Sequence, residues 1–312
     1  MKTLTIGTRG SKLALWQANW VRNELIKCYP GLNVGLNIIK TTGDKITDVA
    51  LSKIGGKGLF VKEIEEALLS NQCDLAVHSM KDVPVVFPEG LSLCAICKRE
   101  DAHDALVLNS KIKADSIESL PQGIKIGTSS LRRQCQLINK RPDFKVETLR
   151  GNLDTRLKKA KEGSYDAVIL AVAGLKRLGL EESISAIIGY DTMLPAVGQG
   201  AIGIETRTND DYVNGIVSSL NDMQSFTCVA AERGFLERLE GGCQVPIGAY
   251  AFMDGDGLLM IEGLVGTVTG SRIIRRQKIG NPQNPQISGK ELAEEILQEG
   301  AGAILDEFYK KG

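Results

Sequence analysis

Two stretches of similar sequence, TIGTRGSKLALWQ at residues 5–17 and KIGTSSLRRQCQL at residues 125–137, decide the fold class. In each, a strand-like run ends at Gly-Thr, and apolar residues at helical spacing follow it. A second similar pair, CDLAVHSMKDV at 73–83 and YDAVILAVAGL at 165–175, occurs in the same order. One short repeat can arise by chance, because strands are generally rich in Ile, Val and Ala. Two pairs in one order favour two similar lobes.

Strands and helices alternate within each of these lobes, which is typical of a mostly parallel α/β sheet. We expect the first lobe to comprise residues 1–99 with 201–218, and the second to comprise residues 105–194. The alternation stops near residue 223. Beyond it come a helix, a glycine-rich turn, three strand-like runs near 247–252, 258–265 and 272–278, and a last helix over about 290–309. This order predicts a small α+β domain over residues 223–312.

The composition argues against nucleic-acid binding and membrane association. The 312 residues carry 38 basic and 38 acidic side chains, and only 5% are aromatic, so neither a basic surface nor a base-stacking surface is indicated. The longest apolar run, Ala167 to Leu175, is far shorter than the ~20 residues of a membrane span. Arg9 and Lys12 interrupt the start where a signal peptide needs apolar residues, so we expect a cytoplasmic protein.

The cysteines and histidines argue against disulfides and metals. Seven scattered cysteines, an odd number, indicate free thiols in a reducing compartment. Cys94 and Cys97 form a lone CxxC inside a predicted strand, which is more typical of buried small residues than of a zinc or redox site. His78 and His103 are the only histidines, so a histidine-rich metal site is excluded and we expect no metal.

Hydroxyl and basic side chains gather where predicted strands pass into helices. Thr8, Arg9 and Ser11 follow the first strand, and residues 128–133 occupy the matching place in the second lobe. Helix N-termini attract anions, so these junctions suit a carboxylate or a phosphate. Ser and Thr at such positions also commonly serve only as helix caps. The sequence leaves both interpretations open.

Further basic residues favour the anion site. They are found at or near other predicted strand ends, where ligands bind in open α/β sheets. The loop KIGGKG lacks the Walker pattern GxxxxGK[ST], so a glycine-bearing lysine loop over a cleft is favoured instead. So many cations from both lobes predict a ligand with many negative groups, bound between the lobes. These basic residues are Lys53, Lys57, Lys81, Arg150, Arg156, Lys176 and Arg177.

Asp82 and Cys243 are the two candidates for chemistry. Asp82, in HSMKDVP, lies among cations that favour its ionised form. It could simply pair with Lys81, or it could stabilise a developing positive charge. Cys243, in GGCQVPIG, could be a small buried residue or a covalent attachment point. From position alone, charge stabilisation is slightly favoured for Asp82, and a small buried residue is favoured for Cys243.

Taken together, the motifs resemble those of the porphobilinogen deaminase (hydroxymethylbilane synthase) family. They run in the family's order from residue 6 to about residue 250, and the last ~60 residues add no family motif. The resemblance implies a monomeric transferase with two α/β lobes like those of type II periplasmic binding proteins, a cleft between them, and a small α+β C-terminal domain. The motifs are IGTRGSKLALWQA, GGKGLFVKE, AVHSMKDVP, GTSSLRRQCQL, RGN, DAVILAVAGLKRLG, LPAVGQGA and LEGGCQVPIGAY.

The resemblance also implies a reaction in tetrapyrrole and haem biosynthesis. Four molecules of the small-molecule substrate porphobilinogen would be joined, with loss of ammonia, on a dipyrromethane cofactor. Water would then release the linear tetrapyrrole hydroxymethylbilane. The cofactor would be attached through a thioether to Cys243, and Asp82 would be the catalytic residue that stabilises cationic intermediates.

The remaining site residues follow from the same resemblance. In addition to Asp82, the cofactor would be bound by Lys81, Ser129, Arg132, Arg133 and Arg156, and the substrate by Arg9, Ser11, Arg150 and Arg177. Lys53, Lys57 and Phe60 would belong to the loop that covers the cleft.

Two other classes of function stay open from the residues alone. A two-lobed anion-binding protein would make Asp82 and Cys243 incidental, although such proteins are usually exported. A cysteine-nucleophile hydrolase or transferase would need a basic partner for Cys243, and the chain has only two histidines to offer.

Overall fold

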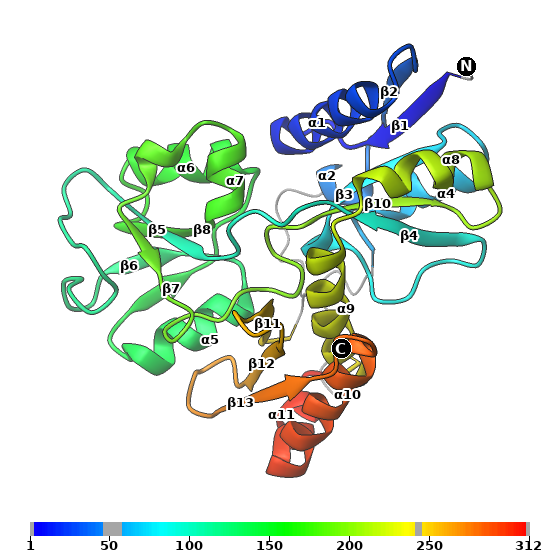
Figure 1. The fold of residues 1–312 in the computed structure, drawn as a ribbon. Coiled ribbons are helices and arrows are strands. Elements are labelled where there is room, and N and C mark those ends of the chain that lie inside the picture. The colour runs from blue at the N-terminus through cyan, green and yellow to red at the C-terminus, as the bar shows by residue number, and fades with distance from the viewer. Residues whose placement is uncertain (1–2, 46–57, 241–244, 310–312) are drawn as a thin grey trace. The chain divides into compact units, whose positions relative to one another are not determined.

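The structure is a computed structural model that describes residues 3–45, 58–240 and 245–309 (Figure 1). The described residues form two compact units. The first contains the described residues up to Glu100 together with Gly200–Phe226, and the second contains Asp101–Gln199 together with the described residues from Thr227 onward.

The first unit is built on a five-stranded sheet of order β2-β1-β3-β10-β4. β1 is parallel to β2 and β3, whereas β10 is antiparallel to both of its neighbours. Four of the five strands thus run in one direction, as expected of a mostly parallel sheet, and β10 is the exception. The strands are β1 (Leu4–Thr8), β2 (Val34–Ile38), β3 (Leu75–Ser79), β4 (Leu91–Ile96) and β10 (Ile202–Arg207).

Helices cover both faces of this sheet. α1 begins where the Ser11 hydroxyl accepts a hydrogen bond from the Ala14 N–H, and it buries Val21 and Leu25 against one face. α4 buries Ile64 and other apolar residues against the opposite face. The helical segments are α1 (Lys12–Cys28), α2 (Thr42–Lys45), α4 (Lys62–Leu69), η1 (Met80–Asp82), α8 (Asp211–Val217) and η3 (Ser218–Leu220).

The second unit contains a five-stranded sheet with the same pattern, in the order β7-β6-β8-β5-β9. β6 is parallel to β7 and β8, and β5 is antiparallel to β8 and β9. The shared pattern confirms the two similar lobes expected from the repeat. The elements are β5 (Asp104–Leu108), β6 (Lys125–Gly127), α5 (Leu131–Lys140), β7 (Lys145–Glu147), α6 (Leu153–Lys161), β8 (Ala167–Ala171), α7 (Val172–Arg177), η2 (Glu181–Ser183) and β9 (Ala186–Ile188).

A three-stranded antiparallel sheet, β11-β12-β13, follows in the second unit. Its strands pack with Phe235 and Leu292 in one apolar core, as expected of a small α+β domain. The last helix begins earlier than expected and is interrupted at Gly300, whose φ of 96° suits glycine. The elements are α9 (Met223–Arg238), β11 (Ile247–Met253), β12 (Leu259–Gly266), β13 (Ile273–Gly280), α10 (Pro285–Ile296), a π-helical turn (Leu297–Ala301) and α11 (Gly302–Tyr309).

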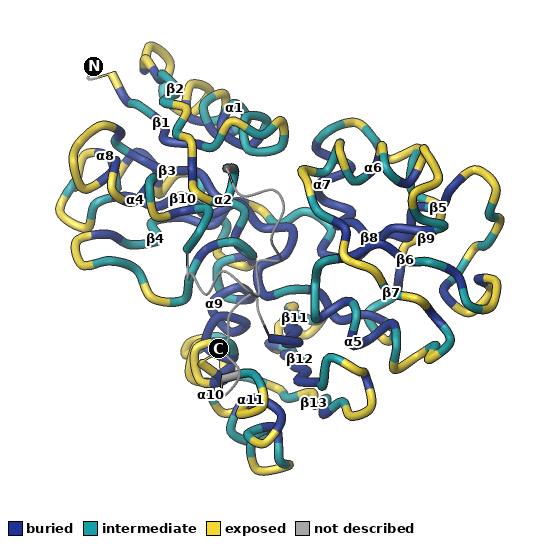
Figure 2. The backbone as a smooth tube through the Cα atoms, turned by 180° about the vertical axis from the view of Figure 1, so that it is seen from behind, coloured by how far each residue is buried: buried dark blue, intermediate teal, exposed yellow. Residues whose placement is uncertain are grey.

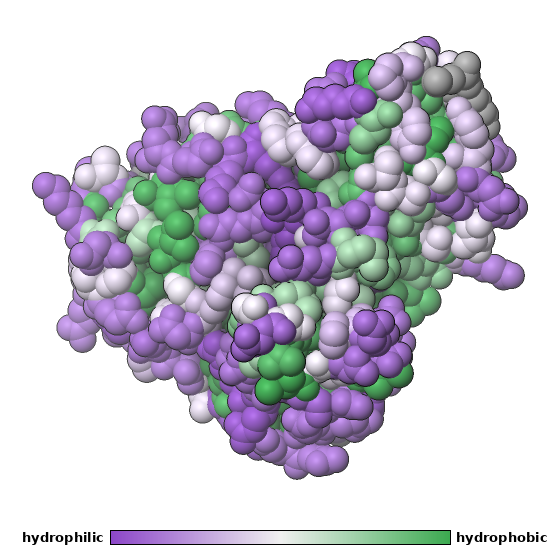
Figure 3. Space-filling view, in the orientation of Figure 1, coloured by the Kyte–Doolittle hydropathy of each residue, from purple (hydrophilic) through white to green (hydrophobic). Residues whose placement is uncertain are grey.

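Burial follows the layers of each unit. Figure 2 shows the inner strands of the sheets in the buried colour and many connecting turns exposed. Hydrophilic residues cover most of the face seen in Figure 3, with apolar residues in separate patches. Within the described ranges, every helix is too short or too polar to cross a bilayer.

Candidate functional site

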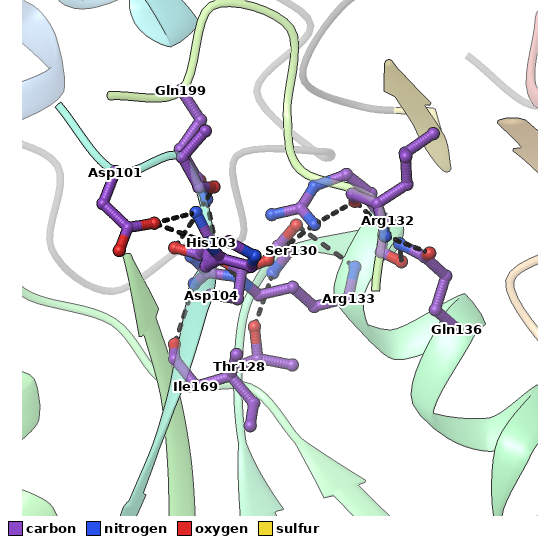
Figure 4. A network of polar contacts seen from close by, with 12 residues as sticks. Asp101, His103, Asp104, Thr128, Ser130, Arg132, Arg133, Gln136, Ile169 and Gln199 are labelled. Carbon is purple, nitrogen blue, oxygen red and sulfur yellow. Dashed lines mark hydrogen bonds and ion pairs between the residues drawn. The ribbon is translucent and has the colours of Figure 1, made fainter. Parts of the chain in front are cut away.

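Arg132, Arg133 and Asp104 form a buried cluster of charged side chains in the second unit (Figure 4). The Ser130 hydroxyl caps α5 by accepting from the Arg133 N–H, so both arginines lie in the first turn of the helix. Asp104 opens β5 and is completely buried. Its two oxygens lie 2.7 Å from Arg132 Nη1 and 2.6 Å from Arg133 Nη2.

This cluster carries more positive than negative charge. Burial alone would raise the pKa of Asp104, but the charges of Arg132 and Arg133 hold it far below its usual range. One carboxylate therefore faces two guanidinium groups that are only 4% and 5% exposed. Within the described part of the chain, Arg132 Nε is buried and has no hydrogen-bond partner. Such a site lacks negative charge, and an anionic ligand would supply it.

Backbone carbonyls and Gln199 fix the orientation of this cluster. Arg132 donates to the carbonyl of Leu194 at 2.7 Å, and Arg133 donates to that of Ile169 at 2.8 Å. The Gln199 amide donates to Asp104 Oδ1 at 3.0 Å. The side chains are thus held in one geometry from three parts of the chain.

Three further predicted residues of the second unit meet at the loop ahead of α6. The Ser129 hydroxyl donates to the Leu149 carbonyl at 2.5 Å, and Arg156 Nε donates to the Gly151 carbonyl at 2.8 Å. Arg150 lies between these two loop residues, and its Nη1 is buried without a partner among the described residues. The loop therefore also presents donors that suit an anion.

In the first unit the structure brings Arg9 and Phe60 together. The Arg9 guanidinium lies 4.1 Å from the centroid of the Phe60 ring and pairs with Asp44 at 2.5 Å. Burial acts to raise the pKa of Asp44, but hydrogen bonds from Arg9 and Thr41 lower it below its usual value. Ser11, proposed as a substrate ligand, caps α1 in this structure.

Lys81 and Asp82 lie in the 3₁₀ turn η1 that continues directly from β3, and both are half-buried. Arg177 ends α7 and is 9% exposed. Lys53, Lys57 and Cys243 lie outside the described residues.

Sequence reasoning missed Asp104 and Gln199. A signal for Asp104 existed, because it opens the apolar strand DALVL. A carboxylate at a buried strand end needs cationic partners. The signal for Gln199 is weaker, since nothing in its neighbourhood distinguishes a buried amide from an exposed one.

Comparison with known families identifies the chain. A family model described as "Porphobilinogen deaminase, dipyromethane cofactor binding domain" matches residues 4–215, and one described as "Porphobilinogen deaminase, C-terminal domain" matches residues 226–298. The chain belongs to the porphobilinogen deaminase family. It is a transferase of tetrapyrrole synthesis with hydroxymethylbilane synthase activity, and residues 4–215 match the family's cofactor-binding domain.

Solved structures similar to the chain include two periplasmic binding proteins. One is the aliphatic sulphonate binding protein SsuA from Escherichia coli, with 12% identity over 77% of this chain and 71% of that one, at a TM-score of 0.41. Another is the arginine-specific binding protein STM4351 from Salmonella typhimurium, with 15% identity over 72% of this chain and 94% of that one, at a TM-score of 0.42. These scores describe a partial overlap, and the fold class follows from the strand orders given above.

Proposed function

We propose that the chain builds hydroxymethylbilane on a dipyrromethane joined to Cys243 by a thioether, with Asp82 as the catalytic carboxylate. The observation that carries this proposal is the buried cluster in which, among the described residues, Asp104 is the one carboxylate paired with Arg132 and Arg133. A carboxylate of the cofactor would balance the excess positive charge.

The donor set fits a group with several carboxylates. When bound, the dipyrromethane supplies the pyrrole carbon to which porphobilinogen units are joined. Arg132 Nε has no partner within the described residues, so it is available to the cofactor. The residues that would hold the cofactor are Lys81, Asp82, Ser129, Arg132, Arg133 and Arg156.

We assign the incoming porphobilinogen to a second set of donors. Arg150 supports this because its Nη1 is buried without a partner among the described residues. Asp82 would accept hydrogen bonds from pyrrole N–H groups and stabilise positive charge as it develops. Lys53, Lys57 and Phe60 would belong to the loop over the cleft. The substrate-binding residues would be Arg9, Ser11, Arg150 and Arg177.

The proposed organisation extends to the whole chain. We assign residues 1–99 with 201–218 to the first lobe, 105–194 to the second and 223–312 to the C-terminal domain. The chain would act as a cytoplasmic monomer without nucleic-acid or membrane partners.

The attachment is tested by the mass of the denatured protein. We expect an excess equal to two porphobilinogen units less two ammonia, located on the peptide that contains Cys243. The Cys243→Ser variant should lack it, and the Cys28→Ser variant, altered at an exposed thiol, should retain it. If the purified chain is unmodified, adding porphobilinogen should produce the adduct. Failure to form it then would contradict the proposal.

The role of Asp82 is tested by Asp82→Asn, which keeps the shape of the side chain and removes its charge. We expect kcat for porphobilinogen consumption to fall by roughly 10²-fold or more, because charge stabilisation in the transition state is lost. Asp211→Asn, altered at an exposed residue in the first turn of α8, should leave kcat unchanged. Equal turnover by both variants would show that Asp82 is not catalytic.

A further inference from the structure

Glu232, in α9, is a completely buried acidic side chain to which the proposed reaction assigns no role. Both of its oxygens accept hydrogen bonds from backbone N–H groups. Oε2 accepts from Gly198 at 2.7 Å, and Oε1 accepts from Ala251 at 2.8 Å. A buried carboxylate needs such partners, and through them Glu232 joins the loop of residues 194–199 (loop 194–199) to β11.

β11 needs a partner on this side because it is an edge strand. It lies at the end of the order β11-β12-β13, and the outer N–H groups of such a strand need acceptors. Ala249 and Ala251 are two residues apart, so their N–H groups point the same way. Ala249 donates to the Pro195 carbonyl at 3.1 Å, and Ala251 donates to Glu232. Loop 194–199 and Glu232 therefore take the place of a further strand along this edge.

The same loop carries contacts that orient the arginine cluster (Figure 4). The Leu194 carbonyl accepts from Arg132 Nη1 at 2.7 Å, and the Gln199 amide donates to Asp104 at 3.0 Å. Glu232 bonds the residue directly ahead of Gln199. Loop 194–199 is thus held by the cluster at both ends and by Glu232 and β11 in between.

β11 also lies directly against Arg132. A Cβ added at Gly248 would lie 3.4 Å from Arg132 Cδ, and it would lie 3.1 Å from the Pro195 carbonyl oxygen. The strand, the loop and the arginine side chain are therefore closely packed. Val197 of the loop packs in the apolar core of the three-stranded sheet. A shift of the loop relative to β11 would displace Arg132 as well.

We propose that Glu232 is a positioning residue for the cofactor-binding arginines. It holds loop 194–199 against β11, and the loop in turn holds Arg132 and, through Asp104, Arg133. The inference rests on the role proposed above for both arginines as ligands of the cofactor. When one of the bonds of Glu232 is lost, the loop gains freedom, and the guanidinium groups no longer meet the cofactor carboxylates in a single geometry.

Glu232→Gln tests this role with little change of shape. The amide oxygen can still accept from one N–H group, but the amide nitrogen is a donor and would face the other N–H group. One of the two bonds is therefore lost, and a buried donor is left unpaired. Glu237→Gln is the matched control, because Glu237 lies on the same helix in an exposed pair with Lys290.

Turnover is measured per cofactor-loaded chain, with the loading read from the mass of the denatured protein. For Glu232→Gln we expect kcat with porphobilinogen to fall by roughly tenfold or more, because small displacements of binding groups are costly. KM should stay within about twofold of the native value, since the incoming substrate is assigned to other donors. Glu237→Gln should match the native chain in both. All assays use buffer in which urea unfolding curves show each variant to be folded, so a loss of stability alone would leave kcat unchanged.

Gln199→Met provides a second route, should Glu232→Gln fold poorly. It removes the bond from loop 194–199 to Asp104 and leaves Glu232 in place, so it should also lower kcat without raising KM. Because both residues act through one loop, the double variant should lose less kcat than the product of the two single losses. Independent, multiplying losses would contradict the shared path.

A native kcat in folded Glu232→Gln would overturn the positioning role. A raised KM at native kcat would also overturn it, because Glu232 would then act on the incoming substrate. If the native chain forms no adduct with porphobilinogen, the proposed function fails instead, and hydrogen exchange still decides the positioning. The Leu194 N–H donates to the Gln136 side chain at 2.8 Å, and it should exchange faster in Glu232→Gln than in Glu237→Gln. Equal exchange in the two variants would refute the coupling.

Discussion

Replacing Asp104 by asparagine should destabilise the second unit by about 3–5 kcal/mol, the usual effect of removing one partner from a buried ion pair. The side chain is completely buried and neutralises part of the charge of Arg132 and Arg133 at 2.7 and 2.6 Å. Asparagine would keep the volume but leave two buried cations without a carboxylate. The pKa of Asp104 in the folded chain is held far below 3.8, its value in the unfolded chain. The ionised side chain therefore contributes fully to the unfolding free energy above pH 3.8, and this contribution is lost only as the pH falls below 3.8.

The assay is urea unfolding followed by circular dichroism at pH 6 and 8, at equal cofactor loading. Glu162→Gln is the matched control, because it removes a carboxylate from an exposed i,i+4 pair with Lys158 and should cost no more than about 0.5 kcal/mol. The double variant Asp104→Asn/Arg133→Gln should lose less unfolding free energy than the sum of the two single variants, because Arg133→Gln removes one of the uncompensated cations. A loss for Asp104→Asn as small as that of Glu162→Gln would refute the argument.

The remaining predictions concern thiol reactivity and helix packing. Cys135 is buried and burial raises its pKa to about 12, so it should resist iodoacetamide at pH 8 in the folded chain. Exposed Cys28 should react under the same conditions. Peptide masses would show the difference, and equal labelling of the two thiols would contradict the prediction. Gly289→Ala should lower the unfolding free energy by about 2 kcal/mol or more, because a Cβ on α10 would collide with the Ala231 carbonyl of α9. Gly215→Ala in α8 is the control, because a Cβ at this position would meet open space, and it should be neutral or stabilising by up to ~1 kcal/mol. Similar losses of unfolding free energy for Gly289→Ala and Gly215→Ala would disprove the packing argument.

Local patterns in the sequence were enough to predict many of the strands and helices and the two similar lobes. Apolar spacing predicts α1, whose buried residues include Ala18, Val21 and Leu25. The direction of β10 and β5 could not be predicted in the same way. Each is antiparallel to its neighbours, and that depends on pairing with strands far away in the sequence. Periodicity reports which face of a strand is buried, but not the direction in which it runs.

The candidate site was predicted in part. The basic residues at strand ends were found because their positions are local, and the structure gathers Ser129, Arg150 and Arg156 at one loop. The acidic partner Asp104 was missed. A buried carboxylate is recognised by its neighbours in space, and Asp104 lies 28 residues from Arg132 and 29 from Arg133 along the chain.

The position of β10 has a consequence for the way the chain folds as it leaves the ribosome. The sheet of the first unit has four strands by residue 96, but the strand between β3 and β4 begins only at Ile202. The five-stranded sheet of the second unit uses only residues 104–188 and can close earlier. Synthesis therefore leaves the edges of β3 and β4 open for more than a hundred residues, a period in which binding by a chaperone would protect them. The lobe that is made first is completed last.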